Sequence, residues 1–110
     1  MINLNYLNTL FPNQPQIIET VISLAISEFP QFKRDFKRCT KNEDKHGLKK
    51  LAHKWQYTAM ILGIDDIKHN LEKFRECEKF KAIQIAQLSS EVINQLEGVV
   101  KELHHLKSAA

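Results

Sequence analysis

The chain has 110 residues, a length that suits one domain and is too short for several. Hydrophobic residues make up 43% of it, which is enough to form one buried core. The sequence contains sixteen basic and thirteen acidic residues, and the formal net charge of +3 is too small to indicate a dedicated nucleic-acid binder. The longest apolar stretches, around residues 21–26 and 59–64, are too short to cross a membrane, so we expect no membrane partner.

The compartment is predicted from the first residues and from the cysteines. Residues 1–12 lack the basic start and apolar run of a signal peptide, and we expect a cytoplasmic protein. Cys39 and Cys77 lie far apart and form no CxxC pair, which favours two reduced thiols over a zinc or redox motif.

Prolines divide the first third of the chain. Residues 2–10 predict a short helix that ends at Phe11-Pro12, after which Asn13 offers a cap and Pro15 suits a first helical turn. Apolar residues then recur at helical spacing, at Ile17, Ile18, Val21, Ile22, Ala25 and Phe29. Pro30 is expected to end or kink this helix, or to start another one with Phe32, Phe36 and Cys39 on its inner face.

Three further helices are predicted after the polar turn at residues 41–44. The first spans about 45–62, with Gly63 at the C′ position that favours glycine. Asp65 and Asp66 are expected to cap the second, whose inner face carries Ile67, Leu71 and Phe74. After a break near 77–79, the last helix spans about 79–107, with a stripe at Ile93, Leu96, Val100 and Leu103.

These elements predict an all-α fold. Helices joined by short turns pack as antiparallel neighbours, so we expect an up-down antiparallel four-helix bundle with an extra N-terminal helical segment. The N-terminal segment comprises residues 1–12, and the bundle domain comprises residues 13–110.

The helix at about 45–62 carries one histidine away from its apolar stripe. At about 100° per residue, a third of its circumference is apolar, at Leu48, Leu51, Ala52, Trp55, Ala59 and Leu62. His53 lies outside this stripe and is expected in solvent. One turn before it are Lys49 and Lys50, with Lys54 beside it. Gln56 and Tyr57 follow one turn later, and Met60 follows two turns later.

An exposed histidine on a rigid helix is suited to carrying a phosphoryl group. Neutral imidazole is a good nucleophile at physiological pH, and nearby ammonium groups stabilise a phosphoryl group during transfer. Lys49, Lys50, Lys54 and Gln56 are the candidates for that stabilisation. Tyr57 and Met60 would form an apolar rim that a partner protein could bury.

The segment from Leu51 to Gly63 resembles the signature of histidine-containing phosphotransfer (HPt) domains. That signature has a histidine, any residue, an apolar residue, lysine, glycine and two small residues, with a second glycine ten positions after the histidine. The matching residues here are His53, Trp55, Thr58, Ala59, Leu62 and Gly63. The preceding aromatic-proline-aromatic step, Phe29-Pro30-Gln31-Phe32, also follows the family's order, and the resemblance extends from about Pro15 onward.

The resemblance implies a four-helix bundle whose histidine relays phosphate between the receiver domains of a hybrid histidine kinase and a response regulator. His53 would be the phosphorylated residue of a monomeric carrier that is not a turnover enzyme. The Mg²⁺ needed for transfer would belong to the receiver, and the chain itself would hold no cofactor. Gln56 replaces the family's lysine and Tyr57 replaces its glycine.

Two alternatives remain open at this point. The departures at Gln56 and Tyr57 are also compatible with a non-catalytic HPt-like module that binds and sequesters a receiver domain. The basic run from Lys33 to Arg38 could form a nucleic-acid or scaffold surface, although Asp35 and Phe36 interrupt it and a solvated helix face is the simpler interpretation.

The other histidines do not predict a metal site. His104 and His105 are adjacent, and adjacent helical residues point about 100° apart, which is unsuited to chelating one ion together. We do not expect His46 or His69 to bind a metal ion either, so we expect no metal.

Overall fold

The computed structural model describes residues 2–109, so the expected domain limits at residues 1 and 110 lie just outside the described residues. The described chain is all-helical, with no strand between residues 2 and 109. The helices are α1 (Asn5–Leu10), α2 (Pro15–Lys41), α3 (Lys45–Ile61), α4 (Asp65–Glu72), the 3₁₀ segment η1 (Lys73–Lys79) and α5 (Ala82–Ala109).

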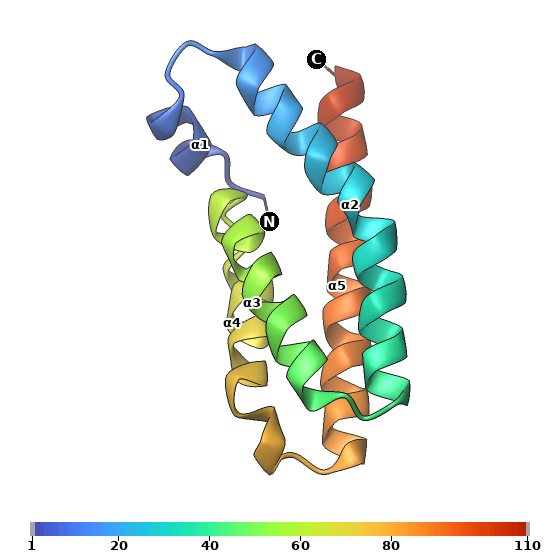
Figure 1. The fold of residues 1–110 in the computed structure, drawn as a ribbon. Coiled ribbons are helices and arrows are strands. Elements are labelled where there is room, and N and C mark those ends of the chain that lie inside the picture. The colour runs from blue at the N-terminus through green and yellow to red at the C-terminus, as the bar shows by residue number, and fades with distance from the viewer. Residues whose placement is uncertain (1, 110) are drawn as a thin grey trace.

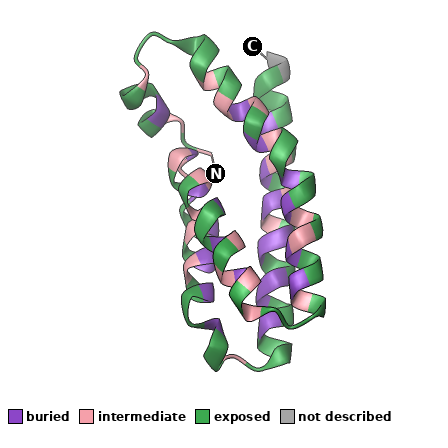
Figure 2. Cartoon of the chain, viewed as in Figure 1, coloured by how far each residue is buried: buried purple, intermediate pink, exposed green. Residues whose placement is uncertain are grey.

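The helices form an elongated body measuring 46 × 22 × 19 Å. As Figure 1 shows, α2 descends, α3 ascends, α4 and η1 descend again, and α5 returns along the full length of the molecule. Helix α2 packs against α3 and α5, and α4 packs against the same two helices. Figure 2 shows the buried residues on the inner faces of these helices. None of the helices within residues 2–109 has the length and apolar character needed to cross a membrane.

Helix α2 passes through Pro30 without ending, although the sequence predicts an end, a kink or a new helix there. Proline inside a helix costs about 3 kcal/mol because it removes one hydrogen bond and crowds the preceding turn. Pro30 itself is exposed, while Phe29, Phe32 and Phe36 are buried on the opposite face. Burial of three aromatic side chains on one continuous face more than offsets that cost. Ile17 was expected in the same stripe, but it is exposed near the start of α2, where fewer elements cover the helix.

Helix α3 begins and ends at specific caps. The Asp44 carboxylate accepts a hydrogen bond from the Gly47 N–H at 2.9 Å, which satisfies one of the first free backbone donors. At the other end, Gly63 N–H donates to the Met60 carbonyl and Ile64 N–H donates to the Ala59 carbonyl, at 3.2 and 2.9 Å. These two bonds form a Schellman motif, with Gly63 at the predicted C′ position and a positive φ of 67°.

The remaining helix limits differ slightly from those predicted. The side chains of Asp65 and Asp66 do not cap α4, because Ile64 is the N-cap residue and the two aspartates form the first turn. Their negative charges there still stabilise the helix through a favourable interaction with its dipole. Gln14, rather than Asn13, precedes α2, with Pro15 in the first turn as predicted. The last helix begins at Ala82 instead of about residue 79, because η1 continues to Lys79.

The N-terminal segment is attached to the end of α3. Leu7 is 1% exposed within the core, and the Asn3 N–H donates to the Leu62 carbonyl at 3.0 Å. A Cβ placed on Gly63 would lie 2.5 Å from the Asn3 carbonyl oxygen. Gly63 therefore serves both the left-handed turn and the close approach of this segment.

We predict opposite effects of alanine at two glycines. Gly63→Ala should lower the free energy of unfolding by about 1–2 kcal/mol from left-handed backbone strain alone, with the contact to Asn3 adding to the loss. Gly98 lies on the exposed side of α5 with open space around it, so Gly98→Ala should raise the same quantity by about 0.5–1 kcal/mol. Urea unfolding followed by circular dichroism would measure both changes. Equal stability of the two variants would contradict this account of Gly63.

Candidate functional site

Helix α3 is fixed by its buried face, which determines where its other face points. Leu48, Ala52, Trp55 and Ala59 are all at most 5% exposed. The Trp55 ring packs against Phe32 of α2 with ring centroids 4.7 Å apart. These contacts prevent rotation of α3, so its outer face is presented in one orientation. The predicted stripe is therefore buried, except that Leu51 at its edge is only half-buried.

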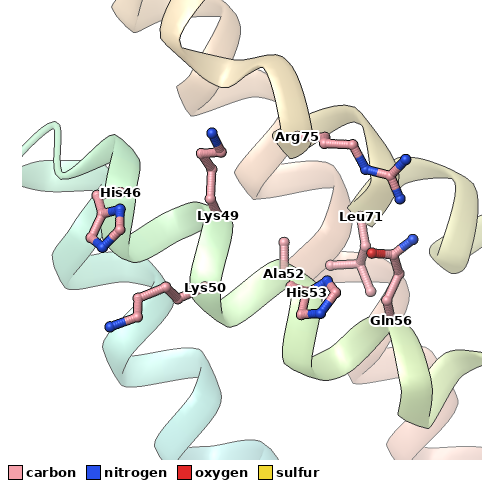
Figure 3. Close-up of a pocket in the computed structure, with 8 residues that line it drawn as sticks. All are labelled: His46, Lys49, Lys50, Ala52, His53, Gln56, Leu71 and Arg75. Carbon is pink, nitrogen blue, oxygen red and sulfur yellow. The ribbon is translucent and has the colours of Figure 1, made fainter.

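His53 lies on the exposed outer face of α3, where the helical wheel predicts it. It borders a pocket of about 320 Å³ between α3 and the α4–η1 segment. The pocket is lined by His46, Lys49, Lys50, Ala52, His53, Gln56, Leu71 and Arg75. Figure 3 shows that Gln56 and Arg75 extend into the same region beside the His53 ring.

A second, smaller pocket of about 150 Å³ lies on the Tyr57 side of the histidine. It shares His53, Gln56 and Arg75 with the first, and Tyr57, Met60 and Lys68 complete its lining. Neither pocket has an aspartate or glutamate in its lining. A negatively charged group beside His53 therefore meets cationic and neutral side chains on both sides.

Arg75 is the functional candidate that sequence reasoning misses. It belongs to η1, 22 positions after His53, and no local periodicity or motif relates the two residues. The tertiary packing relates them, because Phe74 and Cys77 on either side of Arg75 are fully buried against the rest of the protein. Their burial leaves Arg75 pointing outward, where its planar guanidinium can bind a phosphate through two parallel hydrogen bonds.

Two lysines of α3 hold η1 in place. The Lys45 ammonium group donates to the Glu78 and Phe80 carbonyl oxygens at 3.1 and 3.0 Å. The Lys49 ammonium group lies 2.6 Å from a Glu78 carboxylate oxygen. The hydrogen bond to Glu78 raises the pKa of Lys49, and the same bond lowers the pKa of the Glu78 carboxyl. Lys49, predicted as a phosphate partner, is thus already paired with a carboxylate.

Tyr57 contacts the His53 ring directly. The two ring centroids are 5.3 Å apart and the planes meet at 82°, an edge-to-face arrangement. Tyr57 is nevertheless 55% exposed, and Met60 is 38% exposed one turn further along. Both side chains of the predicted rim are therefore exposed, and Tyr57 restricts one approach to the imidazole.

The other predicted site residues divide by position. Lys50 and Gln56 line the larger pocket, whereas Lys54 is exposed and lines neither pocket. Trp55 and Ala59 belong to the core, Thr58 is half-buried, and Gly63 ends the helix. Residues 2–107 contain no group of three or more histidine, cysteine, aspartate or glutamate side chains that could hold a metal ion.

The two cysteines are buried thiols without a disulfide between them. Burial is the main cause that raises the pKa of each thiol, and the neighbouring carboxylates of Asp44 and Glu78 raise the pKa of Cys39 and Cys77 respectively. Because the thiolate is the reactive form, both groups are poor nucleophiles and metal ligands.

Carboxylates partly neutralise the basic run in α2, and Phe36 within the run is fully buried. Lys33 pairs with Glu97 at 2.6 Å, and Arg38 lies 3.1 Å from Asp35. Local pairing of this kind favours the solvated-face interpretation over a nucleic-acid surface.

Comparison of the chain with protein-family models, curated proteins and solved structures finds no significant match in any of the three. Functional inference therefore depends on the site itself.

We predict that the Lys49–Glu78 pair makes a pH-dependent contribution to stability. Glu78→Gln should lower the melting temperature slightly at pH 7, where the native pair is charged. The native pKa of Glu78 is lowered, so this contribution is complete above the carboxyl's unfolded pKa and is lost as the pH falls through the native pKa. The difference between the two proteins should therefore vanish in acid. Melting curves from pH 7 to pH 3 would measure it, and a constant difference would contradict the assignment.

Proposed function

We propose that this chain is a cytoplasmic, monomeric phosphoryl carrier of the HPt type, in which an up-down antiparallel four-helix bundle presents His53 to receiver domains. The observation that carries the proposal is an exposed imidazole in the middle of a firmly packed helix, with pockets free of acidic side chains on both sides. The resemblance of residues 51–63 to the HPt signature supports the same function.

The proposed reaction exchanges a phosphoryl group between two side chains. The unprotonated ring nitrogen of His53 attacks the phosphorus of a receiver's aspartyl phosphate. The new N–P bond forms as the bond between phosphorus and the aspartate oxygen breaks, and the aspartate leaves as a carboxylate. The ring proton of the resulting imidazolium passes to solvent. Reversal of these steps donates the group to a second receiver, so the chain is a carrier without turnover of its own.

Arg75 and Gln56 are suited to stabilising the phosphoryl group during this exchange. Both line the two pockets that flank His53, and together they offer up to seven N–H donors. Arg75 supplies the positive charge that Gln56, in the position of the family's lysine, lacks. Lys50 adds a second cation at the larger pocket, while Lys49 is occupied by Glu78.

We predict that phosphate from a phosphorylated receiver domain is found on His53. His53→Gln should abolish labelling, because glutamine has no nucleophilic nitrogen at that position. His46→Gln is the matched control, since His46 lies on the same helix and borders the same pocket, and it should be labelled normally. Intact mass spectrometry at neutral to alkaline pH would measure phosphate, with circular dichroism to verify folding. Labelling of the His53→Gln protein would place the acceptor elsewhere.

The contact of Tyr57 with the imidazole favours a second candidate function, a module that binds a receiver domain without accepting phosphate. An aromatic ring at this position occupies space that a docking receiver needs close to His53. In that case the receiver would be held on the Tyr57 and Met60 rim and sequestered.

Substitution of Tyr57 separates the two functions. For a carrier, Tyr57→Ala should change the transfer rate severalfold while Tyr57→Phe, which keeps an aromatic ring beside His53, transfers at the original rate. For a sequestering module, no variant should be labelled, receiver binding should survive His53→Ala, and Tyr57→Ala should weaken it. Rapid-quench labelling and calorimetric titration with the same receiver would provide the two readouts.

A further inference from the structure

The larger pocket beside His53 is bigger and more cationic than a protein-bound phosphoryl group requires. Its volume of about 320 Å³ is at the lower end of the range for small-molecule sites. Lys49, Lys50 and Arg75 contribute to its lining and His46 lies at one end, while Figure 3 shows that the Lys50 ammonium group extends away from Arg75. The chain has thirteen acidic residues, yet none lines this pocket.

Two of the three cations have no acidic partner among the described residues. Lys49 is paired with Glu78, but neither Lys50 nor Arg75 forms any of the ion pairs found within residues 2–107. A cation without a carboxylate partner attracts an anion more strongly than a paired cation does. Arg75 of η1 is such a cation at this pocket, and Lys50 of α3 adds positive charge to the pocket's lining.

The pocket also has an apolar part. Ala52 of α3 and Leu71 of α4 contribute its lining between the cationic groups. A bare phosphate ion would leave this surface uncovered. A phosphate that carries a small organic group would contact both the cations and the apolar side chains, which is the usual division of roles in a ligand pocket.

We propose that this pocket binds a small organic phosphate, with its phosphate group on the Arg75 guanidinium and its organic group against Ala52 and Leu71. Binding requires no partner protein and no phosphoryl transfer, so it goes beyond the proposed carrier function. Arg75 is the main anchor, because a guanidinium holds a phosphate through two hydrogen bonds in a fixed geometry.

A ligand in this position would also cover one side of His53. The histidine borders the pocket, so an occupied pocket and a docked receiver would compete for the same space. This consequence depends on the proposed carrier function, whereas the binding itself does not. A soluble phosphate compound would then act as a competitive inhibitor of phosphoryl transfer to His53.

Titration of the full chain with phenyl phosphate, followed by amide nuclear magnetic resonance, tests the proposal. We expect saturable shifts at residues of α3 from 46 to 56 and near Arg75. Phenol, which lacks the phosphate, should not bind, and inorganic phosphate, which lacks the organic group, should bind severalfold more weakly. Equal affinity for inorganic phosphate and phenyl phosphate would overturn the role of Ala52 and Leu71.

Two substitutions that each remove one positive charge provide the decisive comparison. Arg75→Gln should weaken phenyl phosphate binding about tenfold, the typical cost of losing a charge-assisted hydrogen-bonded contact. Lys54→Gln is the matched control, because Lys54 is exposed next to His53 on α3 but lines neither pocket, and it should change the affinity less than twofold. Equal weakening by both substitutions would mean that only diffuse surface charge attracts the anion, which would overturn the site.

The outcomes for the ligand and for the carrier function are distinguishable. Phenyl phosphate binding without receiver-dependent labelling of His53 would support the pocket and remove the carrier function. Labelling of His53 without saturable binding of phenyl phosphate would support the carrier function and overturn the ligand pocket. If both hold, phenyl phosphate should slow transfer to the wild-type protein and lose most of this effect on Arg75→Gln, measured relative to that variant's own uninhibited rate.

Discussion

Attachment of η1 to α3 is the interaction on which the candidate site depends. The buried side chains of Phe74 and Cys77 hold the segment from inside, and the Lys45 ammonium group donates to the Glu78 and Phe80 carbonyl oxygens at its end. A 3₁₀ segment has poorer hydrogen-bond geometry than an α-helix, and Glu76 within it has non-helical backbone angles of −114° and 25°. External attachment therefore compensates for weak internal bonding, and it brings Arg75 beside His53.

The same attachment explains why some parts of the site were predictable from sequence and others were not. The exposure of His53 depends only on the periodicity of α3, which an amphipathic helix displays in its own sequence. Arg75 depends on the path of the chain through α4 and η1, which no pattern near residue 75 specifies. The role of Lys49 depends likewise on Glu78, 29 positions away, so the sequence identified the cation but not its partner.

The fold shows a similar division between local and tertiary signals. Gly63 was predictable because a left-handed C′ residue is a local backbone requirement. Continuation of α2 through Pro30 was not predictable, because it depends on the summed burial of aromatic residues against α3 and η1. Phe36, for example, packs edge-on against Phe74 with ring centroids 5.2 Å apart. Burial of Asn70 was not predictable either, since its amide nitrogen donates to Gln95 and Glu91 of α5, more than twenty positions away.

The four cations near His53 have two different roles, since two of them attach η1 to α3 and the other two line the pocket. Lys45 and Lys49 face Glu78 and the end of η1, so their positive charge is used within the fold. Lys50 and Arg75 line the pocket, and neither has a carboxylate partner among the described residues. An arrangement in which all four cations were paired internally would leave the imidazole in a nearly neutral setting, with little attraction for a phosphate. An arrangement with none paired would leave η1 poorly attached and Arg75 unplaced. The observed division gives a fixed site that still carries net positive charge, which is the condition that both a transferred phosphoryl group and a free phosphate require.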